Sequence, residues 1–130
     1  MSRLSVAFFS AAVLYAIVGM VLGMVMGASG DHTLAPVHAH INLLGWASLA
    51  LMGAFYGLAG PLAPARLGWA NFAISNVGNL LTLPLLAMLL EGDRSIVPLM
   101  AAGEGIIVLG MLVFGAAVWV VARRSPPLPA

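Results

Sequence analysis

The chain has 130 residues, of which 62% are hydrophobic and 7% charged, and it contains no cysteine. A soluble domain usually carries about 25% charged residues, so five basic and four acidic side chains cannot cover a domain of this size. The composition therefore excludes a soluble enzyme, a nucleic-acid-binding domain and a disordered chain, and the missing cysteines exclude disulfides, iron–sulfur clusters and thiolate zinc sites. It predicts an integral membrane protein.

Four apolar stretches are each long enough to cross about 30 Å of hydrocarbon, which takes about 20 residues in a helix. They cover residues 5–27, 37–58, 67–90 and 96–122. The first stretch is longer than the apolar region of about 7–15 residues in a signal peptide, which favours a retained helix. Because the connections are short and rich in Gly, Pro and Asp, neighbouring helices are expected to run antiparallel. The predicted fold is all-α, a single four-transmembrane-helix up-down bundle over residues 1–130.

The arginines predict the orientation of this bundle. Four of the five lie near helix ends on one side of the predicted membrane: Arg3, Arg66, Arg123 and Arg124. Loops rich in arginine stay in the cytoplasm, so both termini are expected there and the loop with Asp31 and His32 outside. The protein is therefore expected to be a multi-pass protein of the inner, cytoplasmic membrane.

Glycines follow one face of the first helix. Gly19, Gly23 and Gly27 are spaced four residues apart, and such small residues let a second helix approach closely. The partner helix can belong to the same chain or to another copy. An equally good interpretation is that glycine is simply frequent in membrane helices.

All three histidines lie at the start of the second helix, as His32, His38 and His40. Neutral imidazole is the one side chain left in this chain that binds iron, copper or zinc well. Residues two apart on a helix point about 200° away from each other, so His38 and His40 cannot chelate one ion unless the helix begins after them. Histidines at a membrane surface can simply bond to headgroups or loop carbonyls. Two of them in a chain with so few polar residues favour ligation of a cofactor.

Polar residues also occur within the third and fourth helices. Asn71, Ser75 and Asn79 share one stripe of the third helix, and Glu104 lies between two glycines in the fourth. A charged carboxylate in the middle of a membrane costs about 2.5–3.5 kcal/mol, so Glu104 is expected to be protonated or hydrogen-bonded. The favoured interpretation is a polar clasp between these two helices. The alternative is an acid that handles protons or faces a ligand.

At the histidines the chain resembles the catalytic subunit of the heme–copper oxygen reductases, especially the type with b and c hemes. The residues that carry the resemblance are the His38-x-His40 pair, Leu44-Gly45-Trp46 after it, Asp31 before it, and the segment Met52-Gly53-Ala54-Phe55-Tyr56. In that family the first histidine of such a pair ligates the high-spin heme and the second ligates the low-spin heme. The resemblance therefore implies that His38 and His40 bind heme.

The differences from that family limit what the resemblance implies. The family subunit has about twelve helices in three arcs of four, whereas this chain has one set of four, and it lacks further histidines for a copper site. One chain is therefore not expected to be an enzyme of that design. The second helix of each arc carries the heme ligands in the family, which implies a single-arc relative that builds its interior as a homo-oligomer, a dimer or a trimer.

The expected function is that of a membrane heme-binding protein for electron transfer or for binding O2 or NO, with a b-type heme. His40 is the leading axial ligand, His38 a second ligand or a neighbour, and Asp31, Asn42 and Glu104 are candidates to orient the site or handle protons. Membrane lipid, other copies of the chain and a respiratory redox partner are the expected partners, and nucleic acid is not.

Two alternatives stay open. The first is a protein that binds copper or another divalent metal with His32, His38, His40 and Asp31, for delivery to a respiratory enzyme. The second is an assembly subunit of a respiratory complex without a cofactor.

Overall fold

The computed structural model describes residues 1–126, which form helices and no strand. Four helical segments are long and apolar enough to cross a membrane, at residues 3–29, 35–62, 65–90 and 97–124. This confirms the number, order and approximate limits of the predicted helices. The last four residues of the predicted domain, 127–130, lie outside the described part of the chain.

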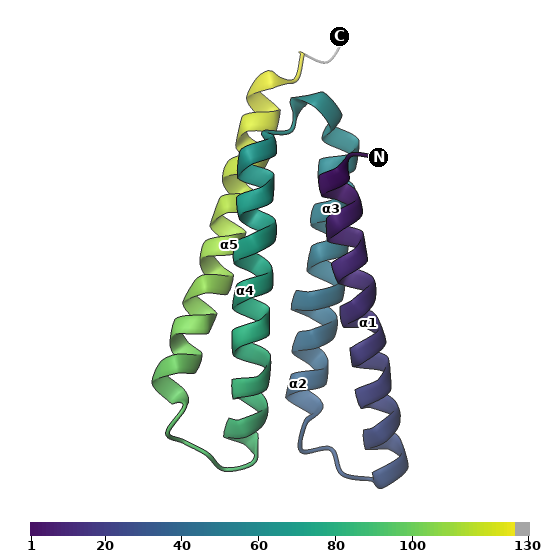
Figure 1. The fold of residues 1–130 in the computed structure, drawn as a ribbon, viewed down its shortest axis with the longest axis vertical. Coiled ribbons are helices and arrows are strands. Elements are labelled where there is room, and N and C mark those ends of the chain that lie inside the picture. Colours follow the sequence, from purple (N-terminus) through teal and green to yellow (C-terminus); the bar gives the residue numbers. More distant parts are fainter. Residues whose placement is uncertain (127–130) are drawn as a thin grey trace.

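Neighbouring helices run antiparallel, as expected (Figure 1). The elements are α1 (Arg3–Ser29), α2 (Ala35–His40), the π-helix η1 (Ile41–Ala47), α3 (Ser48–Ala59), the short 3-10 helix η2 (Gly60–Leu62), α4 (Ala65–Leu90) and α5 (Val97–Arg124). The second predicted helix is therefore not regular, because α2, η1 and α3 follow one another within it.

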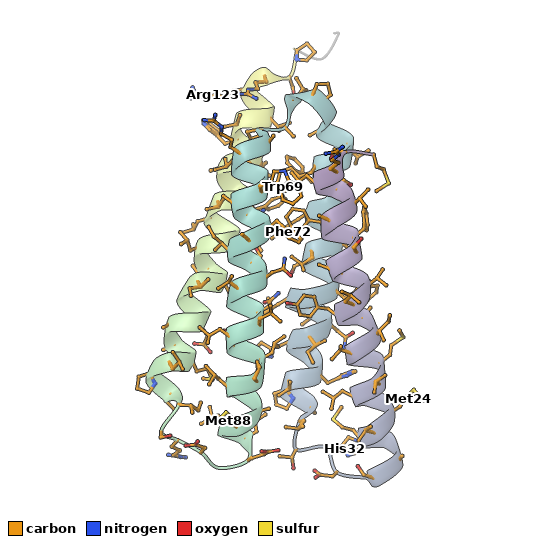
Figure 2. The ribbon with its side chains drawn as sticks, in the orientation of Figure 1. Met24, His32, Trp69, Phe72, Met88 and Arg123 are labelled. Atoms are coloured by element: carbon orange, nitrogen blue, oxygen red, sulfur yellow. The ribbon has the colours of Figure 1, made fainter. Side chains whose placement is uncertain are left out.

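The two ends of the bundle differ in charge. The start of α1, the η2 turn and the end of α5 lie together at one end (Figure 1), which we call the arginine end because Arg3, Arg66, Arg123 and Arg124 are there. The loops 30–34 and 91–96 lie at the opposite end, which we call the histidine end. Figure 2 shows Arg123 and His32 at these opposite ends.

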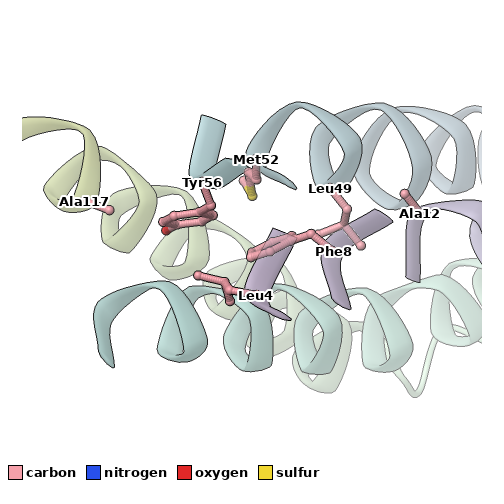
Figure 3. Packing of buried hydrophobic residues seen from close by; sticks show 7 residues of the cluster. All are labelled: Leu4, Phe8, Ala12, Leu49, Met52, Tyr56 and Ala117. Carbon is pink, nitrogen blue, oxygen red and sulfur yellow. The ribbon is translucent and has the colours of Figure 1, made fainter. Parts of the chain in front are cut away.

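The main apolar core lies between α1 and α3, towards the arginine end. Phe8 and Tyr56 stack with ring centroids 5.3 Å apart, and Leu49 and Met52 are buried beside them (Figure 3). Small residues let the two helices approach closely. The Ser5 hydroxyl of α1 donates a hydrogen bond to the backbone carbonyl of Gly53 in α3 over 2.7 Å. This packing fixes α3 and thereby the segment that precedes it, which contains the histidines.

The glycine face of α1 packs against the same chain. A Cβ atom added at Gly19 would lie 2.7 Å from the side-chain oxygen of Asn42, and one added at Gly23 would lie 3.0 Å from Cε1 of His38. Nothing lies within 4 Å of such an atom at Gly27. Of the two possible partners, the structure therefore assigns Gly19 and Gly23 to the second helical segment of the same chain.

The predicted clasp between the polar stripe of α4 and Glu104 is wrong, because the stripe has other hydrogen-bond partners. Asn71 donates to the Tyr56 hydroxyl over 3.1 Å, and Asn79 donates to the Leu44 carbonyl over 3.1 Å. The stripe thus fastens α4 to α3 and η1 by hydrogen bonds. On α5 it is the glycines that approach α4, with Gly110 packed on Ser75. Glu104 lies exposed on α5, because Gly103 and Gly110, and not this carboxylate, pack against α4.

Candidate functional site

The histidines are positioned by a short helix followed by a π-helix. Pro36 is in the first turn of α2, where its missing N–H is not needed, and the histidines occupy the next turn. In η1 the hydrogen bonds span five residues, so that the Ser48 N–H donates to the Leu43 carbonyl. Gly45 permits this segment to lie on α1, because a Cβ there would be only 2.5 Å from the Tyr15 ring. Short π-helical segments such as η1 frequently occur at functional sites.

His38 faces α1 and is half-buried. Its Nδ1 lies 2.9 Å from the Gly19 carbonyl oxygen, so the ring donates a hydrogen bond to the neighbouring helix. Asn42 supports this arrangement, since its amide donates to the His38 carbonyl over 2.8 Å and lies 3.4 Å from both ring nitrogens. His38 and Asn42 therefore dock α2 and η1 onto the glycine face of α1.

His40 is exposed and lies in a groove away from His38. Its Nδ1 is 2.7 Å from the Pro36 carbonyl oxygen, one turn earlier in the chain. The groove has a volume of about 250 Å³, and we call it the His40 groove. Its lining residues are His40, Leu44, Thr82, Leu86, Glu104, Ile107 and Val108. The helix begins at Ala35, before both histidines, and the two rings lie in different surroundings, as the spacing on a helix predicts.

His32 and Asp31 lie in the exposed loop before α2. His32 Nδ1 is 3.0 Å from the Gly30 carbonyl oxygen. The Asp31 carboxylate accepts hydrogen bonds from the Thr33 hydroxyl over 2.7 Å and from the Thr33 N–H over 2.9 Å. These two hydrogen bonds lower the pKa of Asp31 below its usual value and make the residue part of a tight turn. Both residues therefore shape the loop.

All three rings have the same proton arrangement. A backbone carbonyl only accepts hydrogen bonds, so each Nδ1 that faces one carries the proton, and a neutral ring then has its lone pair on Nε2. Each histidine thus presents Nε2 as a base or a ligand. In residues 1–126 no three His, Asp or Glu side chains lie close enough together to hold one metal ion.

Two features of the His40 groove could not be predicted from the sequence. Glu104 of α5 and His40 of α2 line the same groove, although they belong to different helical hairpins. The Thr82 hydroxyl oxygen is buried beside this groove without a hydrogen-bond partner among the described residues. The only sequence signal for Thr82 is its position on the polar stripe of α4, one turn after Asn79.

No family model, curated protein or solved structure matches this chain.

Proposed function

We propose that the protein is a multi-pass membrane protein that binds heme through Nε2 of His40 and acts in electron transfer or in binding a small gas. Three findings support this proposal. Four helices have the length and apolarity to cross a membrane, and large apolar side chains such as Met24, Leu51 and Leu58 cover their outer surfaces. The histidine pair with the following Leu44-Gly45-Trp46 resembles the heme-bearing helix of the oxygen reductases.

The observation that carries the proposal is the hydrogen bond between His40 and Pro36. A histidine that ligates a metal almost always donates its other ring N–H to a carbonyl, a carboxylate or water, which fixes the ring and strengthens the ligand. The 2.7 Å contact with the Pro36 carbonyl supplies this support within one turn of α2. Among the described residues no hydrogen bond occupies Nε2 of the exposed His40.

The arrangement favours heme over a bare metal ion. A bare zinc or copper ion needs three or four protein ligands, whereas a porphyrin brings four nitrogens and needs one or two more. The described residues offer no cluster of three ligands, and His38 is engaged with Gly19 of α1. The accessible His40 imidazole, with Leu44, Leu86 and Ile107 beside it, fits the requirements of heme.

The residues of this chain would have separate tasks in such a site. His40 would hold the iron, and Pro36 would orient the imidazole. The apolar side chains of Leu44, Leu86 and Ile107 would exclude water from the porphyrin edge. Bound heme supplies one-electron transfer or a position for a gas molecule. Because a chain contributes one free imidazole to the groove, a second copy would supply the other axial ligand, which makes a homo-oligomer part of the proposal.

The arginines support an orientation with both termini in the cytoplasm. The arginine end carries four of the five basic side chains, and loops with this charge are kept on the cytoplasmic side. The histidine end, with the His40 groove nearby, would then face the outside of the inner membrane. A respiratory redox partner would reach the site from that side.

Optical spectroscopy tests the proposal. The full chain is purified in detergent, titrated with hemin and compared with His40→Ala and, as a matched control, His32→Ala. We expect a Soret band that saturates in the parent and in His32→Ala and is lost in His40→Ala, because only the groove imidazole holds iron.

Two results would contradict heme binding. A colourless protein that retains copper or zinc, and loses the metal in His32→Ala, would favour a metal-delivery protein. A protein that binds neither hemin nor metal, and tolerates alanine at all three histidines, would favour an assembly subunit.

A further inference from the structure

Three arginines lie at the arginine end, where α4 begins and α5 ends. Arg66 lies in the first turn of α4, and Arg123 and Arg124 are the last two residues of α5. The Arg124 guanidinium donates to the Leu62 carbonyl over 3.2 Å, which fastens the end of α5 to the turn that leads into α4. We call Arg66, Arg123 and Arg124 the arginine corner. All three side chains are exposed.

The positive charge of this corner has no acidic counterpart nearby. Within residues 1–126 the acidic side chains are Asp31, Glu91 and Asp93, in the two loops of the histidine end, and Glu104, in the half of α5 that adjoins that end. Arg3 at the start of α1 adds a further positive charge to the arginine end. The corner therefore attracts anions that residues 1–126 do not supply.

Two tryptophans indicate where the arginine corner lies relative to the membrane surface. Trp119 and Trp69 are 61% and 45% exposed, and each lies about one turn closer to the middle of its helix than the neighbouring arginine. The Arg123 guanidinium carbon lies 4.7 Å from the centre of the Trp119 ring. Tryptophan is enriched where a membrane's headgroups meet its acyl chains, so the arginines would lie at the level of the phosphates.

We infer that the arginine corner binds the headgroup of an anionic phospholipid of the cytoplasmic leaflet. Guanidinium groups bind phosphate oxygens in a forked, charge-assisted geometry, and several of them favour a lipid with net negative charge over a zwitterionic one. The tryptophan rings would contact the glycerol and upper acyl region of the same lipid. The inference rests on the membrane insertion in the proposed function and is independent of heme.

Quenching of tryptophan fluorescence by brominated lipids tests the inference. Trp46→Phe leaves only Trp69 and Trp119, both near the corner. This full-length protein is placed in phosphatidylcholine vesicles that contain a small fraction of brominated phosphatidylglycerol or, separately, brominated phosphatidylcholine. We expect several-fold stronger quenching by the anionic lipid at equal fractions, because it accumulates next to the tryptophans.

The variant Arg66→Gln with Arg123→Gln removes two charges and leaves the bond between Arg124 and Leu62 in place. We expect this variant to lose most of this several-fold preference for the anionic lipid, and high salt to weaken the preference of the parent. Arg94→Gln, at the histidine end, is the matched control and should keep the parental preference.

Three results would overturn the inference. They are equal quenching by the two lipids, a preference that survives in the double variant, and a preference lost equally in Arg94→Gln. Absence of quenching by either lipid would overturn membrane insertion as well. Loss of the Soret band, by contrast, bears on heme alone, so the two proposals can fail separately.

Discussion

The three histidines share one protonation pattern and differ in what surrounds the free nitrogen. His38 is packed between α1 and Asn42, and His32 lies on an exposed loop. His40 borders a groove that is lined by aliphatic side chains together with Thr82 and Glu104. The identity of the residue is therefore a poor guide to its role here. The carbonyl that each Nδ1 meets, and the walls around each Nε2, distinguish a docking residue from a candidate ligand.

The first prediction concerns the contact between His38 and α1. Gly23→Leu places a side chain where the His38 ring lies, and overpacking of this kind costs about 1–3 kcal/mol. We expect a lower thermal unfolding midpoint in detergent, followed by circular dichroism. Gly27→Leu, whose added Cβ would meet nothing within 4 Å, is the control and should unfold like the parent. Equal stability of the two variants would contradict the docking role of His38.

At the scale of elements, the π-helix sets the direction of the histidines. An α-helix turns by about 100° per residue, so the extra residue in η1 rotates the histidine turn relative to α3 by about that angle. The rotation is what allows His38 to meet Gly19 while His40 faces α4 and α5. The segment is held by Gly45 against Tyr15 and by the hydrogen bond from Asn79.

The second prediction is that removing this extra residue moves His40 out of the His40 groove. Deletion of Leu43, an exposed residue of η1, should restore regular α-helix and turn His40 out of its groove. We expect loss of the Soret band after hemin titration, with unchanged helix content by circular dichroism. Deletion of Thr33 from the exposed loop, which leaves η1 intact, should retain the band. A Leu43 deletion that still binds hemin would show that η1 does not orient His40.

The sequence predicts the helices better than their mutual rotation. Long apolar runs between turn residues specify the four spans, because length and apolarity are properties of the chain alone. The rotation of one helix against another depends on packing, such as that of Gly45 on Tyr15, so the π-helix was not predicted. For the same reason the stripe of Asn71 and Asn79 was predicted to meet Glu104, whereas it meets Tyr56 and the Leu44 carbonyl.

At the scale of the whole molecule, the candidate site belongs to neither hairpin alone. His40 comes from the first hairpin, and Thr82 and Glu104 come from the second. The histidine pair was recognisable in the sequence because its members are close together along the chain. The groove was not, since it exists only once α2 and η1 have docked beside α4 and α5.

The third prediction follows from the single free imidazole in each groove. If two copies share one heme, purified protein saturated with hemin should contain one heme per two chains, with the low-spin spectrum of an iron held by two histidines. Heme content is measured by the pyridine hemochrome method against protein concentration, and spin state by electron paramagnetic resonance. One high-spin heme per chain would contradict sharing and would favour an open position for a gas.

Both described ends of the chain, residue 1 and residue 126, lie at the arginine end, because the number of long helices is even. Two such units can therefore be joined head to tail by a short linker without inverting the second unit. In a gene fusion of this kind, His40 can be replaced by alanine in one half while the other half keeps its histidine. It is also the simplest route by which a four-helix unit can grow, through duplication, into a protein of eight or twelve helices.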